Sequence, residues 1–219
     1  CNTTALNGRP FKHDLQERLG YNFRLANDAN CFAFAEAKLG AVREHFANPE
    51  VVFCVIMGTG VGGGLVVHGQ LVTGCQGIGG EWGHIFLDES GGPCYCGNVG
   101  CTERVISGTA LQNYYTEHSG TERKLKEIVD RHLAGVDPVA SQTMERLIYF
   151  FGKGMADVIN IVDPVAVVIG GGVGNIDMLY TDGVDMVRRF VFNNRLDTAF
   201  LRPKLGDSAG VFGAALLYN

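Results

Sequence analysis

Residues 51–64, with the sequence VVFCVIMGTGVGGG, contain the pattern on which the fold prediction depends. The first seven residues are apolar and mostly β-branched, which predicts a buried strand. Glycines follow at once, and glycine after a strand lets backbone N–H groups approach a phosphate. The same order recurs in residues 165–172, VAVVIGGG. Two strands that each end in a glycine loop predict an α/β fold with a nucleotide in a cleft between two lobes.

Neither glycine loop is a specific nucleotide motif by itself. The Gly-Lys-Ser/Thr of a P-loop does not follow residues 58–64, and no clear helix follows them, as a dinucleotide fingerprint requires. A tight β-turn with a bulge is therefore an alternative interpretation of the first loop.

The segments around these strands have helical and hairpin patterns. Residues 65–67 and 70–72 flank His68-Gly69, which predicts a hairpin. Polar Asn27-Asp28 begins an alanine-rich helical segment, so Asp28 is expected at or near a helix N-terminus. Strands that alternate with helices predict an α/β fold. Helices are predicted over residues 25–39, 103–115, 122–133, 139–161, 178–192 and 211–217.

Composition excludes several classes of function. The chain has 18 Lys and Arg against 23 Asp and Glu, a net charge of −5, which disfavours a nucleic-acid partner. Residues 51–80 carry no Asp, Glu, Lys or Arg, but ten glycines interrupt them, so no membrane span is expected. Glycine is abundant at 31 residues, and 15 of these lie between Gly58 and Gly100. The glycine excess thus marks the predicted cleft.

Seven cysteines at uneven spacing argue against a secreted disulfide framework and favour a reducing, cytoplasmic location. Cys54 lies in an apolar run and is expected to be a buried free thiol. His84, Cys94, Cys96 and Cys101 fall within eighteen residues threaded with Gly and Pro, which is typical of a structural Cys₃His zinc site. Chance clustering of buried thiols is the alternative.

Further polar residues accompany these loops. Glu81 and Glu103 flank the predicted metal loop, and carboxylates suit a polyhydroxylated ligand. Asp28, together with Asn27, precedes an apolar helix. An Asp in that position serves either as an N-cap or as a general base, and local sequence leaves both roles open.

Five motifs occur in order along the chain: LANDAN at 25–30, MGTGVGGG at 57–64, EWGH at 81–84, CYCGNVGCTE at 94–103 and IGGG at 169–172. Together they resemble the ROK family of bacterial sugar kinases and related repressors, within the actin-like ATPase superfamily. The resemblance covers essentially the whole chain. It implies a two-lobe actin-like (ribonuclease H-like) fold, with residues 1–48 as a partial small lobe to which 206–219 return, and residues 49–205 as the large lobe with the zinc loop.

The resemblance also implies roles for individual residues. Asp28 would be the catalytic base, and Asn27, Glu81, His84 and Glu103 would hold the sugar hydroxyls. His84 would bind zinc as well, together with Cys94, Cys96 and Cys101. Gly58, Thr59 and Gly60 would face the ATP phosphates, and Gly171 and Gly172 the nucleoside. ATP, Mg²⁺ and Zn²⁺ are the implied cofactors, a hexose the substrate, and a homodimer the expected assembly.

The stretches 7–11, 93–96, 106–109 and 206–211 are most similar to fructokinases and mannokinases, which favours fructose or mannose as substrate. N-acetylglucosamine kinase and glucokinase are alternatives, as are a sugar-responsive repressor and a non-catalytic zinc-stabilised binding module. The family's Asp-x-Gly-Gly-Thr phosphate loop does not occur in these 219 residues. We therefore expect this fragment to keep the base, sugar and zinc sites but not to turn over alone.

Overall fold

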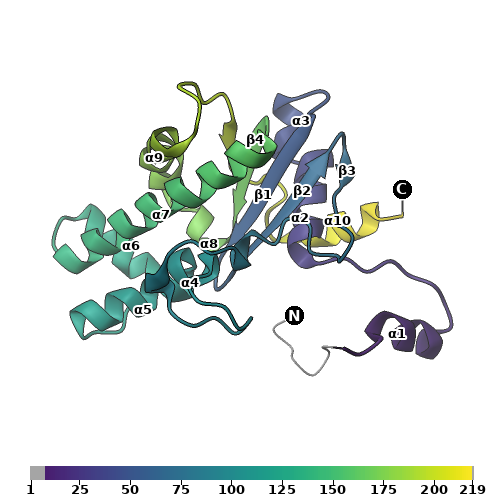
Figure 1. Ribbon diagram of the computed structural model, residues 1–219, viewed down its shortest axis with the longest axis horizontal. Helices are drawn as coiled ribbons and strands as arrows, with labels where there is room; N and C mark the ends of the chain where they lie inside the picture. The colour runs from purple at the N-terminus through teal and green to yellow at the C-terminus, as the bar shows by residue number, and fades with distance from the viewer. Residues whose placement is uncertain (1–7, 219) are drawn as a thin grey trace.

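A computed structural model describes residues 8–218 as three layers with a five-stranded sheet in the middle (Figure 1). Residues 1–7, which include the first residue of the 7–11 stretch and the start of the predicted small lobe, lie outside the described part. The strand order is β3-β2-β1-β4-β5. The neighbours β1, β2 and β3 pair antiparallel, whereas β1, β4 and β5 pair parallel, so the sheet is mixed. The strands are β1 (Val51–Met57), β2 (Val61–Val67), β3 (Gln70–Leu71), β4 (Ala166–Gly170) and β5 (Ala199–Leu201).

Alternate residues of β1 enter two different hydrophobic cores, as the period of two in a strand requires. Phe53 and Val55 pack in the core of the long helix α7 (Pro138–Val162). Val52 and Cys54 pack in the core of α2 (Asp28–Lys38), which α10 (Ala209–Leu216) covers in turn. Helices therefore bury both faces of the sheet, and the α/β prediction is confirmed.

The first glycine stretch divides between a turn and a strand. Only residues 58–60 form the turn, because Met57 already pairs with Val61 and the strand β2 continues through Gly62, Gly63 and Gly64. A Cβ at Gly64 would lie 2.6 Å from the Cβ of Ala33 on α2. The prediction of one continuous loop over 57–64 was thus wrong in its second half, because these glycines let the helix and strand approach closely.

Most long elements were predicted from their patterns. Helix α2, helix α7, strand β4, helix α10 and the hairpin at His68-Gly69 are confirmed within a few residues at their ends. His68 and Gly69 both have positive φ, 47° and 71°, as a tight two-residue hairpin turn requires.

Two predicted helices are each broken in the structure. Residues 103–115 form α4 (Thr102–Ile106) and α5 (Gly108–Ser119), because the Ser107 side chain accepts a hydrogen bond from the backbone N–H of Ala110 (3.0 Å) and caps a new helix. Residues 178–192 form a 3₁₀ turn (Asp177–Tyr180) and α9 (Asp182–Phe190). Helix α6 (Leu125–Leu133) begins three residues later than predicted.

Several short elements carry too little pattern to be predicted. They are α1 (Phe11–Leu19), α3 (Ala41–His45), α8 (Gly171–Gly174), strand β5 and the 3₁₀ turns Trp82–His84, Glu89–Gly91 and Gly206–Ser208. Helix α1 buries none of its residues and lies to one side of the sheet layers (Figure 1). A helix without a buried apolar face leaves no periodic signal in the sequence.

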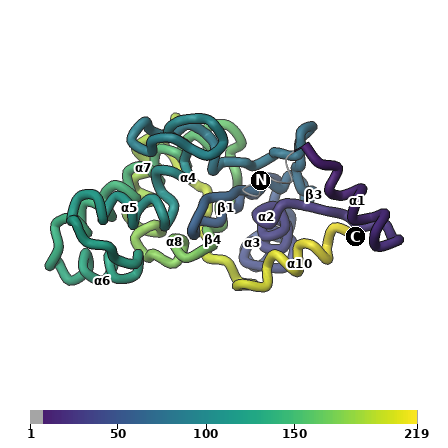
Figure 2. Tube along the Cα trace, turned by 90° about the horizontal axis from the view of Figure 1, so that it is seen from below, coloured from purple at the N-terminus to yellow at the C-terminus, as the bar shows by residue number. Residues whose placement is uncertain are grey.

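The chain segments before β1 and after β5 meet on one face of the sheet, where α10 packs against α2 (Figure 2). The side chain of Glu36, which is fully buried, accepts hydrogen bonds from the backbone N–H groups of Lys204 and Leu205. The assignment of these segments to a separate small lobe stays a prediction. Among residues 8–218, no helix is both long and apolar enough to cross a membrane.

Candidate functional site

The two glycine turns lie side by side at the carboxyl ends of parallel strands. Ile56 of β1 is opposite Gly170 of β4, so both strands end at the same edge of the sheet. A Cβ at Gly171, where φ is +81°, would lie 2.4 Å from the carbonyl oxygen of Met57, so glycine is required where the turns meet. The N–H of Gly108 donates to the carbonyl of Gly58 (2.7 Å) and holds the first turn. This edge is where open α/β sheets bind ligands.

An open pocket of about 740 Å³ lies at this edge of the sheet. The prediction that the polar site residues gather around the glycine turn agrees with its lining. Eight of the predicted sugar, base and phosphate residues line it: Asn27, Asp28, Gly58, Thr59, Gly60, Glu81, His84 and Glu103. Gly171 and Gly172 lie beside the pocket, next to Gly58, and are not part of its lining.

Seven lining residues were not among the predicted site residues: Ala29, Ile56, Val61, Gly62, Ile78, Tyr95 and Asn98. Ile78 and Tyr95 are 59% and 54% exposed although they are apolar or aromatic. The signal in the sequence was a tyrosine between two cysteines of the predicted metal site, and an isoleucine among glycines.

Asn27 and Asp28 occupy the start of α2, and the structure separates their roles there. Asn27 is the N-cap, with its Oδ1 accepting from the N–H of Ala29 (2.8 Å). Asp28 is the first helical residue, is exposed, and accepts from the same N–H through Oδ1 (2.8 Å). Among the described residues nothing donates to Asp28 Oδ2, and that oxygen is free to act on a ligand.

Glu103 connects the helix after the predicted zinc loop to the first glycine turn. Its Oε2 accepts a hydrogen bond from the N–H of Val61 (3.0 Å) and would lie 2.3 Å from a Cβ at Gly60. Glycine at position 60 therefore makes room for this carboxylate. The contact leaves the second carboxylate oxygen available to the pocket.

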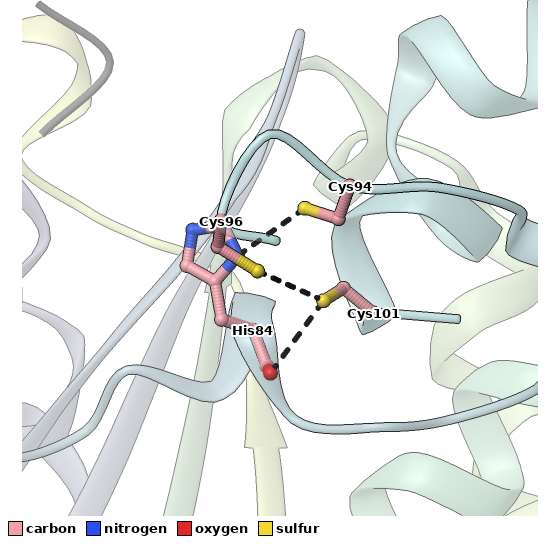
Figure 3. A group of neighbouring side chains, drawn as sticks. All are labelled: His84, Cys94, Cys96 and Cys101. Atoms are coloured by element: carbon pink, nitrogen blue, oxygen red, sulfur yellow. Dashed lines mark hydrogen bonds between the residues drawn. The ribbon is translucent and has the colours of Figure 1, made fainter. Parts of the chain in front are cut away.

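His84, Cys94, Cys96 and Cys101 converge on one point, as predicted (Figure 3). All four ligand atoms lie within 4.8 Å of one another. The His84 Nδ1–Cys94 Sγ and Cys96 Sγ–Cys101 Sγ distances are 3.7 and 3.5 Å. A tetrahedral zinc ion with Zn–S of about 2.3 Å and Zn–N of about 2.0 Å separates its ligands by roughly 3.5–3.8 Å. The donor set and the spacing fit such an ion.

The backbone of the strap over residues 93–101 brings these ligands together. The N–H of Cys94 donates to the carbonyl of Asn98 (2.8 Å), and the N–H of Gly97 donates to the carbonyl of Cys94 (3.0 Å). Gly97 and Gly100 both have positive φ, which turns the strap back toward His84.

Burial and hydrogen bonding act on the thiols in opposite directions. Burial raises the pKa of the Cys101 thiol to about 12, whereas the backbone N–H of Asn98 lowers the pKa of the Cys96 thiol. A buried thiol with a raised pKa becomes a thiolate at neutral pH when a cation lies beside it. A cation at this position would therefore favour the thiolate forms of both residues.

The second nitrogen of His84 is also engaged. Its Nε2 lies 2.8 Å from the hydroxyl oxygen of Tyr95, and the two rings pack edge to face at 5.1 Å. Burial, followed by the nearby Glu103 carboxylate, raises the pKa of the Tyr95 hydroxyl to about 12, so it is protonated at neutral pH.

The sequence and fold of the chain resemble those of known proteins. The family model described as "ROK family" matches residues 1–219. The chain belongs to the ROK family. An N-acetyl-D-glucosamine kinase from Citrobacter koseri is 35% identical over 228 residues, an alignment that covers all of this chain and 74% of that protein.

Solved ROK structures share the fold. The ROK hexokinase from Thermus thermophilus superimposes with a TM-score of 0.84 at 34% identity, over 94% of this chain and 68% of that one. A ROK glucokinase from Streptomyces griseus, in complex with glucose and AMPPNP, gives 0.79 at 31% identity, over 95% of this chain and 72% of that one. The α/β fold is thus that of actin-like ROK kinases, as the motifs predicted.

Proposed function

We propose that this chain carries the catalytic base, sugar site and zinc site of an ATP-dependent kinase that phosphorylates a hydroxyl of a hexose. The observation that carries the proposal is the pocket that Asp28 shares with the glycine turn 58–60. Phosphoryl transfer consists largely of positioning, so an acceptor hydroxyl, a base and the phosphates must meet in one place.

In this proposal Asp28 accepts the proton of the sugar hydroxyl through Oδ2, while Oδ1 is held by the N–H of Ala29. The sugar oxygen forms a bond to the γ-phosphorus, and the bond to the β,γ-bridging oxygen breaks to release ADP. Asn27, Glu81, His84 and Glu103 bind the remaining hydroxyls. Glu103 also holds Val61 and thereby couples the sugar pocket to the phosphate-facing turn.

The ATP site of the proposal uses backbone rather than charged side chains. Gly58, Thr59 and Gly60 face the phosphates, and Gly171 and Gly172 the nucleoside. A Cβ at Gly172 would meet no atom within 4 Å, which leaves room for a nucleotide. Mg²⁺ would accompany ATP and neutralise phosphate charge.

Zinc would be held by His84 Nδ1 and by the thiolates of Cys94, Cys96 and Cys101. Metal on Nδ1 fixes the ring orientation and leaves Nε2 for the sugar. We expect Cys96→Ser to lower bound zinc, measured by elemental analysis, and to weaken sugar binding because His84 serves both. The exposed Cys75 provides a matched control, Cys75→Ser, with unchanged zinc. A wild-type protein purified without chelators that holds no zinc would contradict the assignment.

A panel of four sugars tests which hexose is the substrate. The names of the relatives support N-acetyl-D-glucosamine and glucose as the first sugars to test. Fructose and mannose, which motifs outside the pocket favoured, complete the panel. ADP release with each sugar measures the activity, and no sugar-dependent release from any of the four would contradict the proposal.

The chain covers 74% of the Citrobacter koseri relative, and the Asp-x-Gly-Gly-Thr loop is absent from its 219 residues. We propose that activity needs that loop. The panel is therefore run on the 219-residue chain and on an extended protein, defined as the chain preceded by a segment that supplies the loop. Full turnover by the 219-residue chain would refute the requirement.

Asp28 supports a kinase over a repressor or a non-catalytic binding module, because a sensor has no use for a base. We further propose a homodimer in the cytoplasm, with no nucleic-acid or membrane partner. Light scattering on the purified protein measures its oligomeric state.

A further inference from the structure

The hydroxyl of Tyr95 is hydrogen-bonded to Nε2 of His84, and both residues line the pocket. The His84 Nδ1 is directed to Cys94 Sγ (3.7 Å), whereas Nε2 lies 2.8 Å from the Tyr95 hydroxyl oxygen. Metal on Nδ1 takes the lone pair of that nitrogen, so the ring proton is on Nε2. His84 then has one N–H for the pocket, and Tyr95 accepts it.

Tyr95 lies among the polar groups of the pocket. Its neighbours in the strap are the proposed metal ligands Cys94 and Cys96, and it lines the same pocket as Glu81 and Glu103. A phenolic hydroxyl that is hydrogen-bonded to an imidazole in a pocket with two carboxylates is in the chemical environment expected for a hydroxyl of a bound sugar.

The tyrosine side chain can leave this position at little cost. It is 54% exposed, and its ring contacts His84 by one edge-to-face packing. Among the described residues, the Tyr95 hydroxyl has one hydrogen-bond partner, Nε2 of His84. Rotation of a half-exposed side chain on the surface is fast compared with turnover.

We infer that Tyr95 is a specificity-determining residue that competes with the substrate: its hydroxyl occupies the place of a sugar hydroxyl on His84 Nε2, and a sugar binds by displacing it. The inference rests on the proposed sugar site. A hexose whose hydroxyl reaches Nε2 replaces the hydrogen bond that it breaks. A deoxy analogue that lacks this hydroxyl leaves the N–H of His84 unpaired, and the site rejects it.

The test compares Tyr95→Phe with wild type. Removal of the competing hydroxyl is expected to lower the Kd of the preferred sugar about 2–10-fold, the range of one net hydrogen bond. Calorimetry on the 219-residue chain measures this Kd, and in the extended protein the change is expected in KM for sugar rather than in kcat. Bound zinc is measured on the same samples, because a structural role in the strap would lower it.

Tyr149→Phe is the matched control. Tyr149 is 44% exposed on α7, and its hydroxyl has no hydrogen-bond partner in residues 8–218. The Kd of Tyr149→Phe for the preferred sugar is expected to equal that of wild type.

Each outcome has one reading. A lower Kd for Tyr95→Phe with zinc retained supports the inference. An equal or higher Kd for Tyr95→Phe, or loss of zinc from that variant, overturns the inference. The proposed function still stands in that case if the wild-type chain binds the sugar. Absence of sugar binding by wild type and variant alike overturns both.

Discussion

The two ends of helix α2 each carry a carboxylate, and the two are used in opposite ways. Asp28 is exposed at the first residue, with one oxygen on a single backbone N–H. Glu36 is fully buried and accepts from the backbone N–H groups of Ala41, Lys204 and Leu205. A carboxylate with all its capacity used holds the framework together, whereas one with a free oxygen beside a pocket is available for chemistry.

Glycine shows the same contrast. Gly64 is enclosed, since an added Cβ would lie 2.6 Å from the Cβ of Ala33, whereas an added Cβ at Gly172 would meet nothing within 4 Å. One glycine allows close packing and the other leaves space at the sheet edge. Residue type alone therefore does not separate framework from site in this protein.

The largest effect is expected from Asp28→Asn in the extended protein. Loss of the proton acceptor should lower kcat about 10²–10⁴-fold, the range of general-base catalysis. Sugar affinity and Tm should stay close to wild type, because the amide still accepts from the N–H of Ala29. Steady-state kinetics and calorimetry measure both. Asp130→Asn, an exposed residue on α6, is the control; equal turnover in the two variants would refute Asp28 as the base.

At the other end of the helix, Glu36→Ala should act on stability instead. It leaves three backbone N–H groups without their acceptor, and the free energy of unfolding should fall by about 3 kcal/mol. Urea unfolding followed by circular dichroism measures the change. Glu44→Ala removes the exposed carboxylate that pairs with Lys204, and the free energy of unfolding should fall by less than about 1 kcal/mol. Equal losses in the two variants would show that burial does not distinguish them.

The glycine pair sharpens the comparison at smaller magnitude. Gly64→Ala forces α2 away from β2 and should destabilise by about 1–3 kcal/mol. Gly172→Ala should change stability by less than about 1 kcal/mol, yet raise KM for ATP because its methyl group enters the proposed nucleotide space. Thermal unfolding and ATP titration separate the two effects. A change in stability of the same size in both variants would contradict the distinction.

The smallest expected effect concerns pH and a second framework carboxylate, Asp137. The hydroxyl of Tyr115 (2.7 Å), the guanidinium of Arg131 (2.7 Å) and the N–H of Ala140 hold the pKa of Asp137 well below its usual range. Because the folded pKa is lower than the unfolded value of about 3.9, this contribution to stability is complete above about pH 5 and is lost as pH falls.

Asp137→Asn should therefore lower Tm by about 3 °C at neutral pH. The difference from wild type should begin to shrink as the pH falls below about 4, and it should vanish only below the folded pKa of Asp137. Calorimetric scans between pH 3 and 7 measure it, and a difference that is constant over this range would count against the ionised carboxylate.

The sequence predicted those parts of the molecule whose evidence is local. Apolar periodicity predicts the strand over 51–57 and the helix over 139–161, and the structure contains both. The metal ligands could be grouped because His84 and Cys101 are separated by only 17 positions. The break at Ser107 was missed, since a capping serine inside an apolar pattern does not alter the period.

Other features depend on partners that are distant along the chain. The N–H of Val61 and the carboxylate of Glu103 that accepts from it are 42 residues apart, and Glu36 binds Lys204 across 168 residues. Local periodicity carries no information about such pairs. The extent of the glycine turn was misjudged for the same reason, because Gly64 is explained by Ala33 on another element.

By itself the sequence determined the α/β order, the grouping of His84 with Cys94, Cys96 and Cys101, and the motif order of the ROK family, because apolar spacing and short-range residue spacing are properties of neighbouring residues. Only the tertiary structure decided which glycines serve packing, which carboxylate is enclosed, and that the hydroxyl of Tyr95 lies on Nε2 of His84. Those outcomes depend on where folded elements pack, and burial and hydrogen-bond partners are properties of that packing.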